Sequence, residues 1–197
     1  MALLAVLVAA AVVGADAPSN TPPPGFIALF NGKDLTHWRE SKGQGHWTVV
    51  DGVLHYDGKG DSLKTERDYG DVELYVDWKI GPKGDSGIYL RGNPQVQIWD
   101  DPIGSGGLFN NQKNPSTPTV KADRPPGEWN RFRILMVGDR VTIHLNDVLV
   151  VNDVVMENYW ERDKPLYPRG QIELQHHGAP LYFKNIYLRE IGKGKAK

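Results

Sequence analysis

DSGIYLRGNPQVQIWD, residues 85–100, contains two runs typical of β-strands, Ser86–Arg91 and Gln95–Trp99. The short Gly92–Pro94 connection between them predicts a hairpin or a tight corner. Because successive side chains of a strand point to opposite faces, each run has one apolar side and one polar side. The stretch therefore predicts two adjacent strands with one face in a core and the other face open to a ligand.

The predicted polar side of this hairpin is rich in aromatic rings and hydrogen-bonding groups. It comprises Tyr89, Arg91, Gln95, Gln97 and Trp99. Guanidinium and amide groups make directional hydrogen bonds, and aromatic rings stack on the C–H faces of sugars. We therefore expect a small carbohydrate as the partner of this face.

The rest of the chain also favours short strands over helices. Its 197 residues include 22 Gly and 14 Pro, many of them between apolar runs. Asp51-Gly52 and Asn146-Asp147 each join two strand-like runs as hairpin turns. The long segment 100–124 lacks apolar periodicity and is predicted to be a loop over the polar side of the hairpin. Segment 153–164 is expected to hold at most one helical turn. The pattern predicts one all-β domain, an antiparallel β-sandwich of the jelly-roll type.

The N-terminal end of the chain predicts export. Residues 1–15 are apolar and end in small residues, which is typical of a signal peptide; a retained membrane anchor is the alternative. Residues 16–25 form a Pro-rich linker, 26–191 the domain and 192–197 a basic tail. The chain has no Cys, so a lipoprotein anchor and disulfides are excluded. We expect a periplasmic or extracellular protein whose mature domain binds no membrane; with a net charge of −1, nucleic acid is not an expected partner.

A second run, Gln171–His177, has the same alternation. Ile172, Leu174 and His176 fall on one side, and Gln171, Glu173, Gln175 and His177 on the other. The polar side is either plain solvated surface or part of a site, and His176 is expected to be a packed or capping residue. We predict that this run shares one concave sheet with the hairpin at 85–100 and with the long alternating strand Asp71–Ile80.

Several motifs in order resemble a known family. They are LFNGKDLTHW, WTVVDGVL, YGDVELYVDWKI, DSGIYLRG, QVQIWD, PPGEWNRFRI and IELQHHGAPLYFKNIYLREI. From about Phe26 to Ile191 the chain resembles the 3-keto-disaccharide hydrolase family of bacterial secreted proteins. The resemblance implies a concanavalin A-like lectin/glucanase fold and hydrolysis of glycosides whose sugar is oxidised to a ketone at C3. The chain departs from the family pattern at Asp85, where Asn is usual, and at Gln95, where Glu is frequent.

The resemblance also implies a set of site residues. Matching positions carry over Arg91, Gln97, Asp100, Glu173, Gln175 and His177. A ketone at C3 acidifies the hydrogen at C2, so cleavage can begin by removal of that proton. Either Glu173 or His177 is expected to serve as the base or the acid, and Arg91 is expected to bind the enolate oxygen or an alcohol. The expected substrate-binding residues are Tyr89, Gln95, Gln97, Trp99, Asp100 and Gln175.

Other interpretations stay open at this point. Direct displacement by a carboxylate pair is a second route, with Glu73 and Asp77 as further carboxylates. The sequence has no metal-binding motif, although His177, Glu173 and Asp100 leave a divalent cation open. A non-catalytic carbohydrate-binding module and a structural protein of the outer envelope are the alternative functions, since this fold class hosts several.

Overall fold

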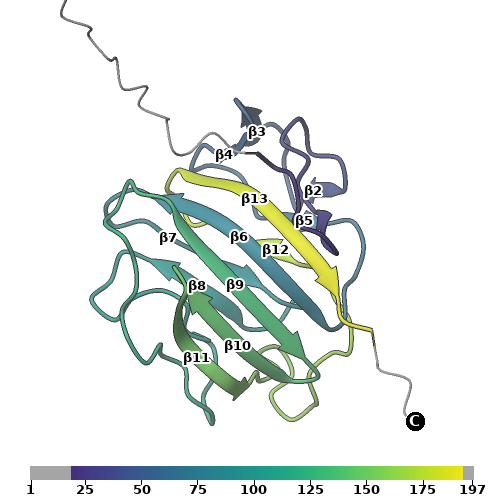
Figure 1. The fold of residues 1–197 in the computed structure, drawn as a ribbon, viewed down its shortest axis with the longest axis vertical. Helices are drawn as coiled ribbons and strands as arrows, with labels where there is room; N and C mark the ends of the chain where they lie inside the picture. Colours follow the sequence, from purple (N-terminus) through teal and green to yellow (C-terminus); the bar gives the residue numbers. More distant parts are fainter. Residues whose placement is uncertain (1–18, 193–197) are drawn as a thin grey trace, which may run out of the picture.

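The computed structural model describes residues 19–192. The predicted signal peptide, the start of the linker and residues 193–197 of the basic tail lie outside the described residues. Within 19–192 the chain forms thirteen β-strands in two antiparallel sheets and no helix (Figure 1). The predicted antiparallel β-sandwich is therefore confirmed.

The larger sheet has eight strands. In spatial order they are β11 (Val148–Val155), β10 (Arg140–Leu145), β9 (Asn130–Val137), β6 (Val72–Ile80), β13 (Leu181–Glu190), β4 (Val53–Tyr56) and β3 (Trp47–Val50), with β1 (Ile27–Ala28) paired to β13. Both predicted hairpin turns are present in it. Asp51 and Gly52 have φ values of +50° and +76°, and Asn146 and Asp147 have +51° and +66°, the left-handed conformation that tight hairpins require.

The smaller sheet has five strands. Their order is β2 (Trp38–Glu40), β5 (Leu63–Thr65), β12 (Glu173–Leu174), β7 (Asp85–Tyr89) and β8 (Gln95–Trp99). The central strand β12 is only two residues long, shorter than the predicted run 171–177. It nevertheless joins the first half of the sheet to the second, because Glu173 pairs with both Lys64 and Tyr89.

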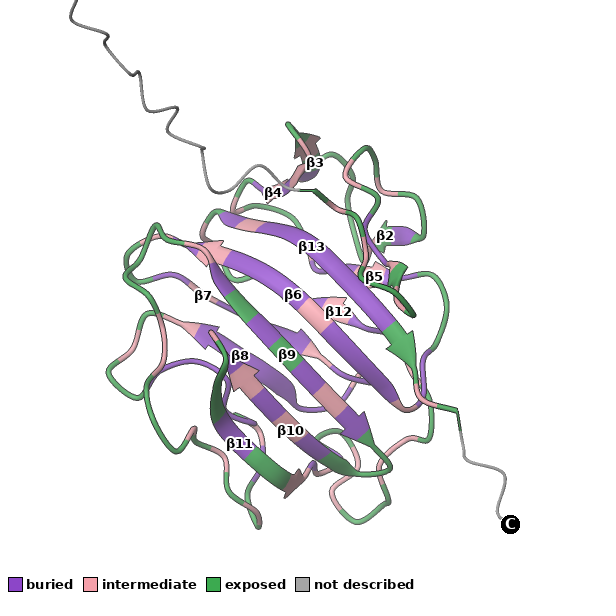
Figure 2. Ribbon diagram, in the orientation of Figure 1, coloured by how far each residue is buried: buried purple, intermediate pink, exposed green. Residues whose placement is uncertain are grey.

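The core lies between the two sheets. Burial alternates along β9 (Figure 2), which buries Phe132, Ile134 and Met136 and leaves Arg133 exposed and Leu135 partly exposed between them. Trp47 and Trp78 are the largest side chains that are almost completely buried. Burial of such apolar side chains stabilises the fold by roughly 1.5–3 kcal/mol each, which makes the sandwich a rigid support for its outer faces.

The structure changes or refines four expectations about the chain. Strand β6 lies in the larger sheet, between β9 and β13, so it does not share a sheet with the hairpin at 85–100. Segment 153–164 begins within β11, which continues to Val155, and it contains one turn, in which Lys164 N donates to Glu161 O at 2.9 Å, but no helix. The loop 100–124 runs along the edge of β8, where Gly106 and Gly107 bond to Gln97, and then reaches β11. The described part of the linker packs on the larger sheet, where Asn20 and Asn185 exchange two hydrogen bonds.

Candidate active site

The outer side of the smaller sheet carries most of the residues that the sequence singled out. One row crosses all five strands through directly paired residues: Arg39, Lys64, Glu173, Tyr89 and Gln95. Because paired residues in an antiparallel sheet point to the same side, their side chains are neighbours. The residues next to them in sequence point into the core.

Two further rows complete this surface. Gln175 donates its backbone N–H to Gly87, which pairs with Gln97. Asp85 pairs with Trp99, and its Oδ2 lies 3.7 Å from His177 Nδ1. We call this surface the polar face, and it comprises Arg39, Lys64, Asp85, Gly87, Tyr89, Gln95, Gln97, Trp99, Glu173, Gln175 and His177. The structure therefore brings together six predicted binding or catalytic residues of the two sequence runs: Tyr89, Gln95, Gln97, Glu173, Gln175 and His177. Trp99, which was also predicted, lies at the edge of this set.

A chain of side-chain hydrogen bonds forms the floor of the polar face. Gln95 Nε2 donates to Gln97 Oε1 at 2.7 Å, and Gln97 Nε2 donates to Asp85 Oδ1 at 2.8 Å. The Asp85 carboxylate can only accept, so it fixes the orientation of both amides. Gln95 and Gln97 are 4% and 2% exposed. Gly87 makes room for this chain, since a Cβ there would lie 2.3 Å from Gln95 Oε1.

Two amide oxygens on this face have no partner among the described residues. They are Gln95 Oε1 and Gln175 Oε1, and both are buried. A buried acceptor without a donor costs about 1–3 kcal/mol, so such groups usually mark a water or ligand position. Hydroxyl groups are suitable donors for both oxygens.

Glu173 occupies the centre of the first row. Its backbone is held between Ile172 and Leu174, which are buried in the core. Its Oε2 lies 3.2 Å from Lys64 Nζ, and the two side chains are 17% and 32% exposed. The carboxylate is thus rigidly placed, next to a cation, and still accessible to a ligand.

Tyr89 stands directly opposite Glu173 in the register. Burial raises the pKa of Tyr89 above its ordinary value of 10.0, and the nearby Glu173 and Tyr159 raise it further. The phenol therefore keeps its proton at neutral pH and can donate it in a hydrogen bond. Gln175 Nε2 lies 3.4 Å from the Tyr89 hydroxyl and helps to orient it.

Arg91 does not reach the polar face, so its predicted place there is wrong. The strand β7 ends at Tyr89, and Arg91 has a φ of +56°, which turns its side chain away. The guanidinium is 5% exposed and donates to Asp71 Oδ1 at 2.6 Å and to the backbone oxygens of Gly70 and Gly138. Arg91 therefore connects the turn after β7 to the start of β6.

Three other predicted carboxylates also lie elsewhere. Glu73 and Asp77 project from the outer side of the larger sheet, where Arg133 and Arg131 bind them at 2.7 Å and 2.5 Å. They cannot form a catalytic pair with Glu173 on the smaller sheet. Asp100 follows β8 and accepts a hydrogen bond from the Lys83 backbone at 2.9 Å, beyond the end of the polar face.

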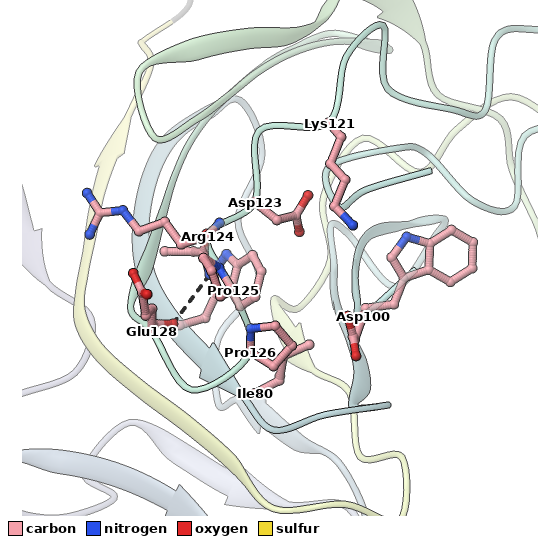
Figure 3. A pocket seen from close by; sticks show the side chains of 11 residues that line it. Ile80, Asp100, Lys121, Asp123, Arg124, Pro125, Pro126 and Glu128 are labelled. Atoms are coloured by element: carbon pink, nitrogen blue, oxygen red, sulfur yellow. Dashed lines mark hydrogen bonds between the residues drawn. The ribbon is translucent and has the colours of Figure 1, made fainter. Parts of the chain in front are cut away.

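A pocket of about 250 Å³ lies at the Trp99 end of the polar face. Figure 3 shows the carboxylates of Asp100 and Asp123 and the amine of Lys121 around it, with Pro125 and Pro126 opposite. Asp123 also binds the backbone of Ser105 at 2.9 Å. Apolar side chains, among them Trp78, Ile80 and Trp99, complete the wall of the pocket, so its lining is part polar and part apolar.

Sequence analysis missed three residues next to this site. Lys64 lies on the three-residue strand β5, whose partner β12 is more than 100 residues away. Tyr159 and Trp160 belong to an irregular segment; Tyr159 N donates to Asn93 and the Trp160 indole to Gly92, beside the hairpin of β7 and β8. Trp160 is 59% exposed. Two adjacent aromatic residues in an otherwise irregular stretch were the signal that could have indicated Tyr159 and Trp160.

Residues 19–192 contain no group of three or more His, Asp or Glu side chains placed to hold a metal ion. Glu173 and His177 lie in different rows of the polar face, and Asp100 lies beyond its end. His176, expected to pack or cap, bonds through Nδ1 to Ser62 Oγ at 2.9 Å. No helix within 19–192 has the length and apolar character needed to span a bilayer.

A family model and a related protein each match most of the chain. The family model described as "3-keto-alpha-glucoside-1,2-lyase-like domain" matches residues 25–189. A protein from Bacteroides thetaiotaomicron named 3-keto-disaccharide hydrolase is 26% identical over 85% of this chain and 79% of its own.

Several solved structures are similar to this chain in fold. A Parabacteroides distasonis protein described as a candidate glycosyl hydrolase is 29% identical, with a TM-score of 0.72 over 86% of this chain and 85% of its own. A carbohydrate-binding module from Bacillus subtilis has a TM-score of 0.53 at 16% identity, over 80% of this chain and 98% of its own. The second likeness concerns the fold alone.

Proposed function

The chain belongs to the family of 3-keto-alpha-glucoside-1,2-lyase-like domains, and we propose that it cleaves the glycosidic bond of glycosides whose sugar carries a ketone at C3. The observation that carries the proposal is the position of Glu173, an accessible carboxylate on a rigid strand, between Lys64 and Tyr89. The name of the Bacteroides relative supports the same substrate class.

The chemistry begins at C2. The ketone makes the C2 hydrogen acidic, and Glu173 is placed to remove it as general base. Loss of the substituent at C1 then needs a proton on the leaving oxygen. Tyr89 stands directly opposite Glu173 and keeps its own proton, so it is the proposed donor of the proton to the leaving oxygen. His177 lies four residues further along an extended chain, about 13 Å away, and is better placed to bind the far part of the substrate.

The substrate-binding role of the remaining polar face follows from its hydrogen-bonding groups. Gln95 and Gln175 each present an oxygen without a partner, which suits sugar hydroxyls. Trp99 supplies a ring at one end. The direct route through a Glu73–Asp77 pair is not part of the proposal, because both carboxylates lie on the other sheet.

One experiment tests the proposal. The protein is incubated with a 3-keto-disaccharide and with the corresponding plain disaccharide, and the products are identified. Cleavage of the keto form alone is the expected result. Glu173→Gln should lower the turnover by about 10²–10⁴-fold, whereas Glu190→Gln, a strand carboxylate on the larger sheet, should not. Absence of cleavage by the wild-type protein would overturn the proposal.

The second candidate function is a non-catalytic carbohydrate-binding module. The likeness in fold to the Bacillus subtilis module favours it. It predicts that the protein binds both disaccharides and cleaves neither, so the same incubation, combined with calorimetric titration, separates the two functions.

We also propose that the protein is exported. The support is the sequence of residues 1–15, an apolar run that ends in small residues. Expression of the full chain in a bacterial host should yield a mature protein in the periplasm or medium that lacks these residues. N-terminal sequencing checks the cleavage position.

A further inference from the structure

Lys64 is the cation nearest to Glu173 on the polar face. The two residues are directly paired across strands β5 and β12, and Lys64 Nζ lies 3.2 Å from Glu173 Oε2. Lys64 projects from the outer side of the sheet, while its neighbours Leu63 and Thr65 are buried. Its ammonium group is therefore held beside the carboxylate from a fixed strand position.

Two arginines near the polar face, Arg91 and Arg39, are less well placed. Arg91 is buried against Asp71 behind the turn. Arg39 pairs with Lys64 on the side away from Glu173, so it stands two strands, or about 10 Å, from the carboxylate. Lys64 alone among these three residues can contact a group that also touches Glu173.

The proposed reaction demands such a pair. As the C2 proton leaves, negative charge develops on the oxygen of the adjacent C3 carbonyl. The base and the group that stabilises this oxygen must therefore act on neighbouring atoms of one ring, and must themselves be neighbours. The 3.2 Å separation of Lys64 and Glu173 satisfies this requirement.

We propose that Lys64 is a catalytic residue whose ammonium group binds the C3 oxygen and stabilises the enolate while Glu173 removes the C2 proton. The inference rests on the proposed function and assigns the reaction to an elimination followed by hydration. The C–H electron pair first forms the C2=C3 bond, and the carbonyl oxygen becomes the enolate. The C3 carbonyl then forms again, the C1–O bond breaks, C1=C2 forms, and the leaving oxygen takes a proton. Water finally adds its hydroxyl to C1 and its proton to C2.

A purely structural role is the alternative. Partly exposed ion pairs across a sheet contribute about 0.2–1 kcal/mol to stability. In that case the removal of Lys64 would change the unfolding midpoint slightly and leave catalysis by the folded protein unaltered. The two roles therefore differ in turnover and in the exchange of the C2 hydrogen.

The test uses p-nitrophenyl 3-keto-glucosides of both anomers, in D₂O as well as in water. The wild-type protein should release p-nitrophenol and exchange the C2 hydrogen for deuterium. Lys64→Met should lower both rates by about 10²–10³-fold, and Lys64→Ala should regain part of its activity when ethylamine is added. Lys79→Met, which removes a strand lysine from the outer side of the larger sheet, serves as the matched control and should keep wild-type rates.

Each outcome decides a separate point. Wild-type activity that survives in Lys64→Met would overturn the role of Lys64 and leave the proposed function standing. Failure of the wild-type protein to act on any 3-keto-glycoside would overturn the proposed function, and the inference with it. If Lys64→Met does not fold, the rescue of Lys64→Ala by the amine, or its absence, decides the question.

Discussion

The guanidinium of Arg91 lies 2.6 Å from the carboxylate of Asp71, behind the turn that follows β7. The same guanidinium also donates to three backbone oxygens, of Gly70, Gly138 and Tyr167. Because Arg91 is 5% exposed, its removal takes a donor from the buried bond to Gly70 and from the part-buried bonds to Gly138 and Tyr167. Arg91 is thus a structural residue of the junction between the two sheets.

We predict that Arg91→Met lowers the free energy of unfolding by about 2–4 kcal/mol, somewhat less than the loss of a fully buried pair, because Asp71 keeps some contact with water. The folded fraction should retain its turnover on a 3-keto-glycoside. Urea unfolding followed by tryptophan fluorescence gives the stability, and active-site-normalised rates give the turnover. A variant of normal stability with greatly reduced turnover would show that Arg91 acts on the substrate after all.

The variant Tyr89→Phe tests whether Tyr89 donates the proton to the leaving oxygen, a role distinct from that of the base Glu173. The sugar alkoxide released from a 3-keto-disaccharide is a poor leaving group unless its oxygen is protonated, whereas p-nitrophenolate leaves without help. We therefore expect a fall of about 10²–10³-fold in turnover on a 3-keto-disaccharide and little change on the p-nitrophenyl substrate. Tyr182→Phe, which removes a tyrosine hydroxyl from the larger sheet, is the control and should keep wild-type turnover on both substrates. Equal losses on both substrates for Tyr89→Phe would contradict the assignment.

Trp160 offers an exposed ring beside the hairpin of the polar face. If it stacks on the leaving sugar, Trp160→Ala should raise the KM for a 3-keto-disaccharide and leave kcat nearly unchanged, because stacking acts on substrate and transition state alike. A loss of about 1–3 kcal/mol in sugar binding is expected by analogy with stacking on bases. Phe109 is also exposed, and its ring contacts that of Trp99, so Phe109→Ala is the comparison variant. A KM equal to that of the wild-type protein would exclude Trp160 from the binding site.

The fold could be predicted from the sequence largely because its signals are local. Asp51-Gly52 and Asn146-Asp147 permit the left-handed turns that hairpins need, and alternation assigned most side chains to the correct face of their strand. Alternation does not say which sheet a strand joins. Val72–Ile80 has the same pattern as the strands of the smaller sheet, yet it pairs with β9 and β13 in the larger one.

The site was predicted less completely, for two physical reasons. The position of Arg91 depends on a left-handed backbone that its residue type disfavours and that its hydrogen bonds to distant segments stabilise. Lys64 meets Glu173 only through pairing across more than 100 residues. By contrast, Asp85 and Gln95, where the chain departs from the family pattern, prove to be the two ends of one hydrogen-bonded chain through Gln97.

Glu73 makes stability depend on pH. Burial opposes its ionisation, but hydrogen bonds from Arg133 and Arg189 outweigh that effect, and the pKa of Glu73 is lowered from 4.5. A lowered folded-state pKa contributes stability above the unfolded-state value, and this contribution is lost as the pH falls through the folded-state pKa. Glu73→Gln should therefore cost about 1–2 kcal/mol at pH 7 and much less at pH 3.

Urea unfolding at several pH values between these limits measures that difference. Asp153→Asn is the control, because the Arg140–Asp153 pair is exposed and should hardly affect the urea midpoint. A gap between wild-type protein and Glu73→Gln that stays constant with pH would contradict the assigned role.

Gln95→Glu tests the direction of the hydrogen-bonded chain on the polar face. Gln97 Nε2 faces the oxygens of Asp85, Ser86 and Ile98, so Gln97 Oε1 must face residue 95. A carboxylate there cannot donate to that oxygen and adds a second negative charge to a short chain. We expect the pKa of the new carboxyl to rise, and the variant to lose about 1–3 kcal/mol of stability at pH 7.

The sign of the pH effect distinguishes this explanation from simple packing damage. A raised folded-state pKa makes the loss small at pH 4, where the carboxyl is protonated and can donate, and larger as the pH rises. Gln95→Met removes the hydrogen bond without adding charge, so its loss should not vary with pH. Adding Asp85→Asn to Gln95→Glu leaves one carboxylate in the chain and should restore part of the stability at pH 7. A double variant no more stable than Gln95→Glu would show that the two ends are not coupled through Gln97.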